Sequence, residues 1–397
     1  MNTYLIIGAS AAGIQAATKI RQSDAISTII CLAQQSDFPY NTCFLVDYMT
    51  QEKTIDQVYL KPLDFFIKNN IDLRLNTTVT VLFPDKKEVQ CADGTVIKYT
   101  KLIIATGAST IVPQWKGVPD TFDMPGLFVF HTLRDTVRLI DWIAQQSNKH
   151  VVVIGAGVTG LECADALWQQ GYSVTVIERG PRVLGRVLDN GGSLFMQSVM
   201  QKVDIDVRLN SSVASVVSCE GVVAGVELTD GTIIKSTTVV CALGARSNSA
   251  LGINAGLAHS DGSLLVNEYM QTSYESVYAV GDVTAVLDKA TGKMVRNCMW
   301  PDALMQGGCA AAHILGQEKP YSGAYILTST HLFGYPIHAM GSVDQEVSEV
   351  SGIFQDEHNY IKKIVDSSGT VQAFVLIGKD LPISHYKRSL LLKKPLQ

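Results

Sequence analysis

Features that would indicate a metalloprotein, a membrane protein or a secreted protein are missing from this sequence. Its eight cysteines include no Cys-x-x-Cys pair, and its eight histidines show no spacing typical of metal ligands, so neither a zinc site nor a dithiol motif is indicated. No apolar run approaches the roughly 20 residues that a membrane-spanning helix needs. The opening MNTYLIIGAS lacks the basic segment and cleavage site of a signal peptide. We therefore expect a cytoplasmic protein with reduced thiols.

Charge is also scarce. Only 17% of the 397 residues are charged, and the net charge is −5. No sustained basic stripe offsets this acidic balance, which argues against nucleic-acid binding. With 47% hydrophobic residues, a chain of this length can form two or three domains, each with its own core.

What the sequence does contain is one pattern that occurs twice. TYLIIGASAAGIQAATKI reads as an apolar strand, a small-residue turn and a helix, and HVVVIGAGVTGLECADAL repeats this order. Each copy later reaches an Asp-Gly pair, Asp93-Gly94 or Asp230-Gly231, and then an apolar run, KLIIA or TVVCA. Asp-Gly suits a tight turn with positive φ, and such runs indicate strands buried on both faces. The repeat predicts two doubly wound, Rossmann-like α/β domains that bind dinucleotides.

The order of the segments predicts that the second domain is inserted in the first, because another strand and turn, VYAVGDVT, follow the end of the second copy. We expect residues 1–112 and 241–318 to form the first dinucleotide-binding domain and residues 113–240 to form the second. Beyond this point, HLFGYPIHAMGSV and GTVQAFVLIG alternate like antiparallel strands. Residues 319–397 are therefore predicted to form a small C-terminal α+β domain.

The second glycine turn matches the dinucleotide fingerprint in full, with Gly155, Gly157 and Gly160. About twenty residues later the strand YSVTVIERG reaches Glu178, where a carboxylate accepts hydrogen bonds from a ribose diol. A carboxylate there would repel a 2′-phosphate, so NADH is favoured over NADPH, although Arg179 and Arg182 soften that preference.

The first turn, from Gly8 to Gly13, has Ser10 where the fingerprint has its second glycine. Small residues still let the backbone approach a pyrophosphate, whose charge the following helix N-terminus stabilises. A plain tight junction between strand and helix would fit the same residues. Ala33 stands at the position that matches Glu178 of the second copy. Gln34, the next residue, can hydrogen-bond a ribose, but more weakly than a carboxylate does.

Besides these turns, further motifs occur in order along the chain, namely LIIATGA, VIERG, ALGARSN, VYAVGDVT and WPDALMQGGCAAAHILG, and the resemblance that they carry covers nearly the whole chain. The sequence resembles the FAD-dependent pyridine nucleotide-disulfide oxidoreductases, most of all the branch with rubredoxin and ferredoxin reductases, nitrite reductase flavoproteins and NADH oxidases. The resemblance implies FAD on the first domain, NADH on the second and a homodimer interface on the last. It implies hydride transfer from NADH to FAD and electron transfer to a small redox protein or a small-molecule acceptor.

The resemblance also implies roles for single residues. The family's aspartate at the position of Asp282 bonds the ribityl chain of FAD, although a helix-capping aspartate would fit the same turn. Trp300 and Ala303 match positions beside the flavin ring, with core packing as the alternative for Trp300. Glu162 matches a glutamate near the nicotinamide and flavin, or else partners a basic residue, and Lys61 matches a basic residue close to the flavin. The expected cofactor-binding residues are Gly8, Ser10, Ala11, Ala12, Gly13, Gln34, Val79, Thr106, Gly107, Gly281, Asp282, Trp300, Ala303, Gly155, Gly157, Val158, Gly160, Glu178 and Gly244.

Cys43, Glu162 and Lys61 are the candidate catalytic residues, and Cys43 is the one with two opposed interpretations. It lies roughly 35 residues after Gly8, as does the redox cysteine of the oxidase, peroxidase and coenzyme A disulfide reductase groups, and a thiolate at a helix N-terminus is reactive. However, TCFLVDYM lacks the glycine that follows that cysteine, and Ala11 stands where the peroxidases have a histidine.

The preceding PYN resembles the rubredoxin reductase and nitrite reductase branch, in which no redox cysteine is required. We therefore favour a packing role for Cys43 and electron transfer to an external acceptor. The alternatives are an NADH oxidase or a coenzyme-A-disulfide-reductase-like enzyme that uses Cys43, and a non-catalytic flavoprotein that senses redox state.

Overall fold

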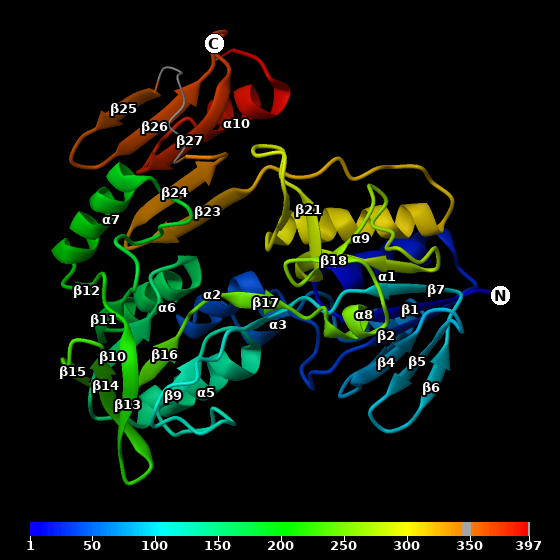
Figure 1. The fold of residues 1–397 in the computed structure, drawn as a ribbon, viewed down its shortest axis with the longest axis horizontal. Helices are drawn as coiled ribbons and strands as arrows, with labels where there is room; N and C mark the ends of the chain where they lie inside the picture. Colours follow the sequence, from blue (N-terminus) through cyan, green and yellow to red (C-terminus); the bar gives the residue numbers. More distant parts are fainter. Residues whose placement is uncertain (344–350, 396–397) are drawn as a thin grey trace. The chain divides into compact units, whose positions relative to one another are not determined.

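A computed structural model describes residues 1–343 and 351–395 (Figure 1). The chain forms two compact units, which are described separately. The first unit comprises residues 1–48, 53–109 and 245–324, and the second comprises residues 49–52, 110–244 and 325–397. Within the described ranges, no helix is long and apolar enough to cross a membrane, and no cluster of side chains could hold a metal ion.

The first unit is built on a parallel sheet with the strand order β20–β7–β1–β2–β3. Its central strand, Thr3–Ile7, is an apolar run that pairs with its two neighbours along nearly its whole length. The last strand in sequence, β20, pairs with β7, so the chain returns to this sheet after leaving it, and the predicted insertion is confirmed. The strands are β1 (Thr3–Ile7), β2 (Thr28–Leu32), β3 (Asp72–Arg74), β7 (Lys101–Ile104) and β20 (Val277–Ala279).

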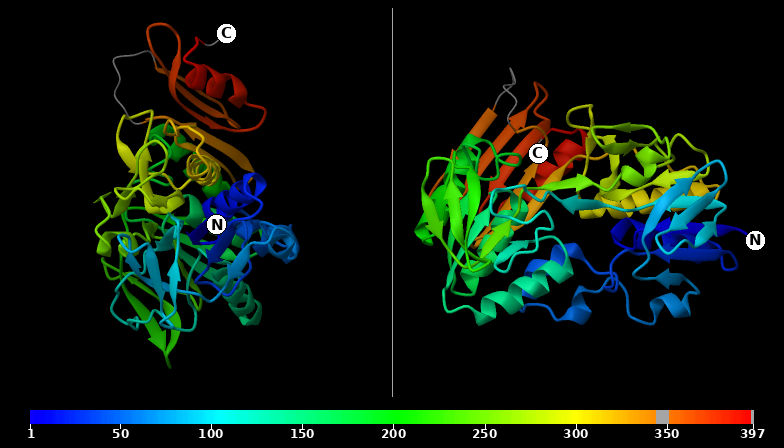
Figure 2. Two further views of the ribbon diagram at one scale, coloured as in Figure 1. Left: turned by 90° about the vertical axis from the view of Figure 1, so that its right-hand side faces the viewer. Right: turned by 60° about the horizontal axis from the view of Figure 1, so that its bottom comes forward.

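Two helices rich in small residues, α1 (Ala11–Ser23) and α9 (Trp300–Ile314), lie side by side in the first unit (Figures 1 and 2). Their backbones approach closely, because a Cβ added at Gly307 would stand 2.2 Å from the carbonyl oxygen of Ala12. Pro301 lies in the first turn of α9, where its missing N–H costs no helical hydrogen bond. This packing places the N-termini of both helices in the same unit as the first glycine turn.

Smaller elements complete the first unit. The predicted hairpin at Asp93-Gly94 is confirmed: it joins two antiparallel strands, and Gly94 has a φ of +85°. These elements are β4 (Val79–Phe83), β5 (Glu88–Cys91), β6 (Val96–Lys98), β8 (Ala108–Thr110), β17 (Ala245–Ser247), β18 (His259–Ser260), β19 (Ser263–Leu265), β21 (Thr284–Leu287), β22 (Met294–Arg296), the α-helices α2 (Leu45–Met49), α3 (Ile55–Val58), α4 (Phe65–Lys68) and α8 (Ala250–Asn254), and the 3₁₀ helices η1 (Thr42–Phe44) and η2 (Gly281–Val283).

The second unit contains another parallel sheet, with the order β12–β11–β10–β16–β9. As in the first unit, its central strand runs into a glycine turn and a helix. The second Asp-Gly hairpin is also confirmed, since Gly231 has a φ of +86° between two antiparallel strands. The elements are β9 (Leu127–Val129), α5 (Leu133–Gln145), β10 (His150–Ile154), α6 (Val158–Gln169), β11 (Ser173–Ile177), α7 (Asn190–Lys202), β12 (Asp206–Arg208), β13 (Val213–Cys219), β14 (Val222–Leu228), β15 (Ile233–Lys235) and β16 (Val239–Cys241).

The predicted C-terminal α+β region forms an antiparallel sheet with the order β23–β24–β27–β26–β25 and belongs to the second compact unit. One helix, α10, packs against its strand β27 (Figure 1). The elements are β23 (Leu327–Leu332), β24 (Tyr335–Met340), β25 (Ser351–Gln355), β26 (Tyr360–Val365), β27 (Val371–Ile377) and α10 (Ile383–Leu392). The assignment of the four predicted segments to FAD, NADH and interface roles stays a prediction.

Candidate functional site

The first glycine turn joins β1 to α1. A Cβ at Gly8 would stand 2.0 Å from the carbonyl oxygen of Ala105, and one at Gly13 would stand 2.0 Å from that of Gly8, so the fold itself requires both glycines. Ser10 is exposed and is the N-cap of α1, yet its side chain makes no capping hydrogen bond. The first N–H groups of α1, at Ala11 and Ala12, therefore have no side-chain cap, and the turn fits a pyrophosphate.

The second turn joins β10 to α6 and has the same design. Gly155 has a φ of +108°, its added Cβ would stand 2.4 Å from the carbonyl oxygen of Ala242, and one at Gly160 would stand 2.0 Å from that of Gly155. Gly157 differs, because a Cβ there would meet no atom within 4 Å. It is the exposed N-cap of α6, and α6 also lacks a capping side chain. Packing therefore does not require a glycine at 157, whereas close approach of a phosphate does.

Glu178 stands directly after β11, beside the second turn. Its Oε2 accepts a hydrogen bond of 2.9 Å from the N–H of Ala156, and its Oε1 accepts one of 2.7 Å from the N–H of Gly180. These bonds hold the carboxylate at the carboxyl end of the sheet, where a ribose diol can donate to it. In the first unit, the matching Ala33 is buried and Gln34 is exposed, so no carboxylate occupies this place.

The turn with Gly281 and Asp282 is held by residues that sequence analysis missed. The N–H of Gly281 donates to Oε1 of Gln306 at 2.7 Å, and the Thr284 hydroxyl donates to the same oxygen at 3.2 Å. The Ser247 hydroxyl donates to the carbonyl oxygen of Asp282 at 2.7 Å. The turn is 3₁₀ helix η2, and strand β21 follows it directly. The alternative in which Asp282 caps a following helix is therefore wrong, since the element that follows the turn is a strand.

The Cys298 side chain lies close to Asp282, and Arg296 lies close to Cys298. Burial, with the Asp282 carboxylate as the second cause, raises the pKa of the Cys298 thiol to about 12, and nearby Arg296 lowers it by less. The thiol therefore stays protonated at neutral pH and is a poor nucleophile. Arg296 itself donates a hydrogen bond of 2.5 Å to the carbonyl oxygen of Ala245.

Thr106 and Gly107 follow β7 in a loop that Asn248 closes. The Thr106 hydroxyl donates to the carbonyl oxygen of Asn248 at 2.8 Å, and Nδ2 of Asn248 donates to the carbonyl oxygen of Thr106 at 2.9 Å. Asn248 is the last residue of the ALGARSN motif, so its presence was visible in the sequence but its partner was not. Val79 is half-buried at the start of β4, and Gly244, in the second unit, has a φ of +93°.

The start of α9 lies next to the Gly281 turn. A Cβ at Gly281 would stand 3.9 Å from Cβ of Ala303, which places Ala303 beside this turn. Trp300 is half-buried and packs on the hydrophobic core of the first unit. In the first turn of the helix, the buried Asp302 accepts a hydrogen bond of 3.0 Å from the Tyr321 hydroxyl.

Cys43 and Lys61 also belong to the first unit. Cys43 is exposed in η1, and its backbone N–H donates to Oδ1 of Asn41 at 3.0 Å. Lys61 is half-buried, with Nζ 4.9 Å from the centre of the Phe65 ring. An exposed thiol is accessible to a small oxidant, which is a requirement for redox chemistry but does not establish it.

Glu162 lies on α6 in the second unit. Its Oε1 accepts a hydrogen bond of 2.6 Å from the Thr330 hydroxyl on β23. One turn later, Asp165 is 4% exposed, and burial raises the pKa of its carboxyl group, partly offset by hydrogen bonds from Gln169 and the Phe333 backbone. No motif in the sequence pointed to Thr330 or Asp165.

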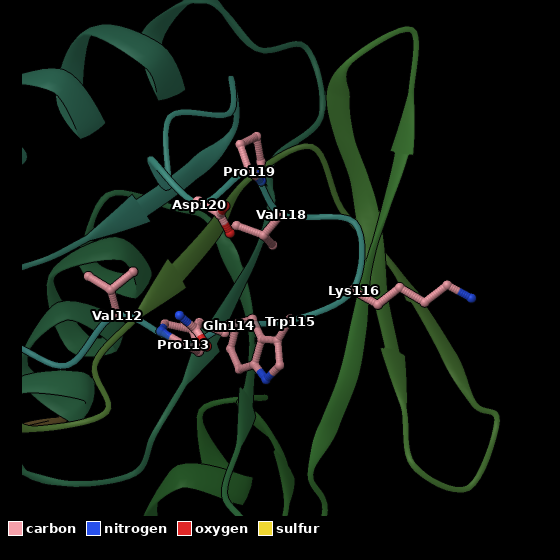
Figure 3. Close-up of a pocket in the computed structure, with 8 residues that line it drawn as sticks. All are labelled: Val112, Pro113, Gln114, Trp115, Lys116, Val118, Pro119 and Asp120. Carbon is pink, nitrogen blue, oxygen red and sulfur yellow. The ribbon is translucent and has the colours of Figure 1, made fainter.

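A hollow of about 380 Å³ in the second unit is lined by a single segment, from Val112 to Asp120 (Figure 3). Trp115 and Val118 form part of its wall, while the Lys116 side chain extends away from it. The hollow contains none of the predicted site residues. The hollow is therefore not part of the candidate site at the glycine turns.

Comparison with known proteins identifies the family to which this chain belongs. The family described as Pyridine nucleotide-disulphide oxidoreductase matches residues 2–326. The chain belongs to this family. It is an FAD-dependent NAD(P)H oxidoreductase, with FAD and NADH as its cofactors.

Individual members of the family match most of the chain. The NADH-dependent phenylglyoxylate dehydrogenase subunit epsilon of Aromatoleum evansii is 30% identical over 372 residues, which cover 92% of this chain and 86% of that protein. An NADH oxidase of Methanocaldococcus jannaschii is 32% identical over 324 residues, covering 80% of this chain and 71% of that protein. The structure of a ferredoxin reductase from Rhodopseudomonas palustris has a TM-score of 0.89 and 25% identity, and the match covers 100% of this chain and 96% of that one.

Proposed function

We propose that the first unit binds FAD at the Gly8–Gly13 turn, the second binds NADH at the Gly155–Gly160 turn, and electrons pass from NADH through FAD to a small redox protein. The observation that carries this proposal is the duplicated design of the two turns. Each leads from a central parallel strand into a helix without a capping side chain, which is the arrangement that a pyrophosphate requires. When bound at the first turn, FAD would supply the hydride acceptor for NADH and the electrons for the next carrier.

NADH is favoured over NADPH because of Glu178. Its carboxylate is held by two backbone N–H groups beside the second turn, where it accepts from a ribose 2′-hydroxyl and repels a 2′-phosphate. Arg182 donates to the carbonyl oxygen of Gly185 at 3.1 Å, so part of the hydrogen-bonding capacity of its guanidinium is used within the chain. Replacing Glu178 with alanine is expected to raise the Kd of NADH about tenfold and to narrow the preference over NADPH.

A protein acceptor is supported by the ferredoxin reductase whose fold this chain shares over its whole length. The match to an NADH oxidase and the exposure of Cys43 support a second candidate function. In this alternative, Cys43 cycles between oxidised and reduced states. We also propose a homodimer formed through residues 319–397 and a cytoplasmic location, both carried over from the sequence.

The deciding experiment is an anaerobic titration of the purified protein with NADH, in which reducing equivalents are counted per flavin. Two electrons per flavin are expected, since flavin is then the single redox centre and Cys43 is not oxidised. Four electrons, falling to two in Cys43→Ser, would replace electron transfer to a protein with thiol or oxygen chemistry. Failure of NADH to reduce the flavin at all would overturn the proposed function.

A further inference from the structure

One hydrogen bond connects the nucleotide-binding part of the second unit to its C-terminal sheet at a candidate catalytic residue. The Thr330 hydroxyl on β23 donates to Oε1 of Glu162 on α6 at 2.6 Å, although the two residues are 168 positions apart in the chain. Hydroxyl-to-carboxylate bonds of this length are stronger than hydrogen bonds between neutral groups. The position of Glu162 is therefore set partly by the C-terminal sheet.

The contact is part of a longer line along α6. The Phe333 backbone lies near the Asp165 carboxylate, and the Trp168 ring lies edge-on to the Phe333 ring, with 6.1 Å between the ring centres. Glu162, Asp165 and Trp168 follow one another at intervals of three residues, so they form one stripe of the helix. β23 and Phe333, the residue after it, contact this side of α6 over two helical turns. These contacts fix the place at which the Thr330 hydroxyl bonds Glu162.

Thr330 is well suited to orient a carboxylate. Its backbone is paired with Ile337 of β24 in the antiparallel sheet, and its β-branched side chain has few rotamers. Glu162, by contrast, has three rotatable side-chain bonds, and a fixed donor selects one of their combinations. A carboxylate has about four acceptor sites, so it can accept from the Thr330 hydroxyl and from an amide N–H donor at the same time.

We propose that Thr330 is a positioning residue, through which the C-terminal sheet orients the Glu162 carboxylate toward the carboxamide of the nicotinamide of bound NADH. This inference rests on the proposed function, in which NADH binds at the turn that leads into α6. Glu162 comes five residues after the exposed Gly157 at the start of that helix. Thr330 thus acts on the reacting end of the dinucleotide, whereas Glu178 acts on the ribose of its adenosine half.

The test compares variants of the FAD-loaded enzyme. Thr330→Val removes the hydroxyl and keeps the shape, and Thr330→Ser keeps the hydroxyl. Thr328→Val is the matched control, because Thr328 shares the strand and the face of Thr330. The limiting rate of flavin reduction by NADH is measured by anaerobic stopped flow, the Kd of NADH from its concentration dependence, and the Kd of ADP-ribose, which lacks nicotinamide, by calorimetry.

We expect Thr330→Val to lower the limiting reduction rate about tenfold, since small misplacements of a reacting pair have large effects on rate. The Kd of ADP-ribose is expected to stay within about twofold of the wild-type value, as are all constants of Thr330→Ser and Thr328→Val. Unfolding temperatures measured for all the variants identify any loss that comes from folding, and Thr330→Ser tests the hydroxyl even where the valine variant is unstable.

A wild-type reduction rate in Thr330→Val would overturn the inference, and so would an equal loss in Thr330→Ser or Thr328→Val. Those results differ from failure of the proposed function, which would appear as a wild-type protein that binds no ADP-ribose and is not reduced by NADH. Loss of ADP-ribose binding in Thr330→Val alone would also overturn the inference, because the effect would then not be confined to the nicotinamide end.

Discussion

At the scale of single residues, the glycines of the two turns have separate purposes. Gly155 and Gly160 lie against carbonyl oxygens that a Cβ would contact at 2.4 and 2.0 Å, whereas a Cβ at Gly157 would meet no atom within 4 Å. The backbone of the second unit thus requires two of these glycines, whereas under the proposed function the third leaves room for the phosphates of NADH. Substitutions can separate the two requirements.

Gly157→Ala is expected to fold like the wild type and to bind NADH at least about tenfold more weakly, because the added methyl group occupies the space that a phosphate approaches. Gly155→Ala is the control. With a φ of +108° at this position, it is expected to lower the unfolding temperature through strain and contact. Thermal unfolding and an NADH titration of both variants check this, and wild-type NADH affinity in Gly157→Ala would contradict it.

The cysteines are expected to differ sharply in reactivity. Burial raises the pKa of the Cys31 and Cys163 thiols to about 12, and burial together with Asp282 does the same for Cys298. Cys43, Cys219 and Cys298 are all exposed, but the pKa of the Cys298 thiol is raised. At pH 8, iodoacetamide is therefore expected to label Cys43 and Cys219 before Cys298, because the thiolate is the reacting form, and before the buried cysteines, which the reagent does not reach.

Peptide mass spectrometry after short exposure measures the labelling of each cysteine. Rapid labelling of Cys298 in the folded protein would contradict the expectation. A denatured sample, in which all eight cysteines are labelled at similar rates, is the control.

At the scale of elements, α6 begins at the second glycine turn and has a buried acidic residue, Asp165, on one side. Asp165 is 4% exposed, and its Oδ1 has no hydrogen-bond partner. Because burial raises the pKa of this carboxyl group in the folded state, the protonated form stabilises the fold. That contribution is complete below the unfolded pKa of about 3.9 and is lost as the pH rises through the folded value.

Asp165→Asn is therefore expected to raise the unfolding temperature at pH 8, by about 2–4 °C, and to raise it less near pH 4. The substitution removes the charge that burial disfavours while keeping the shape of the side chain. Thermal unfolding at several pH values checks this. A gain that is equal at pH 4 and pH 8 would show that charge is not the cause.

At the scale of the whole molecule, the C-terminal sheet belongs to the second unit through buried polar contacts as well as apolar ones. The Asp189 carboxylate accepts from the Tyr360 hydroxyl at 2.8 Å and from Lys362 Nζ at 3.1 Å, and it also caps α7 by accepting from the Gly192 N–H. The side chains of Asp189 and Lys362 are only 7% and 15% exposed. One carboxylate thus joins α7 to β26.

Asp189→Ala is expected to destabilise the second unit by about 3 kcal/mol, because it leaves the Lys362 ammonium without its buried partner. Asp123→Ala is the matched control. It breaks the ion pair between Asp123 and Arg138, in which the side chains are 76% and 52% exposed, respectively. This substitution is expected to change the free energy of unfolding by less than about 1 kcal/mol. Chemical denaturation followed by circular dichroism measures both, and equal effects would contradict the role assigned to burial.

The sequence alone determined the duplicated βα units, both glycine turns, the Asp93-Gly94 and Asp230-Gly231 hairpins and the insertion of one domain in the other. These features depend on local backbone preferences and on the spacing of apolar residues, which a linear sequence displays directly. The same information predicted Glu178 as the ribose-binding residue, because its place at the end of a strand, about twenty residues after a glycine turn, can be seen in the sequence.

Only the tertiary structure decided which side chains hold those turns in place. Gln306 bonds Gly281, Asn248 closes the Thr106 loop, and Thr330 meets Glu162 from 168 residues away. The capping alternative for Asp282 was excluded in the same way, by the strand that follows it. Such contacts join residues that are distant in sequence and belong to no motif. They are fixed only when the packing of sheets and helices brings donors and acceptors together, which local preference does not specify.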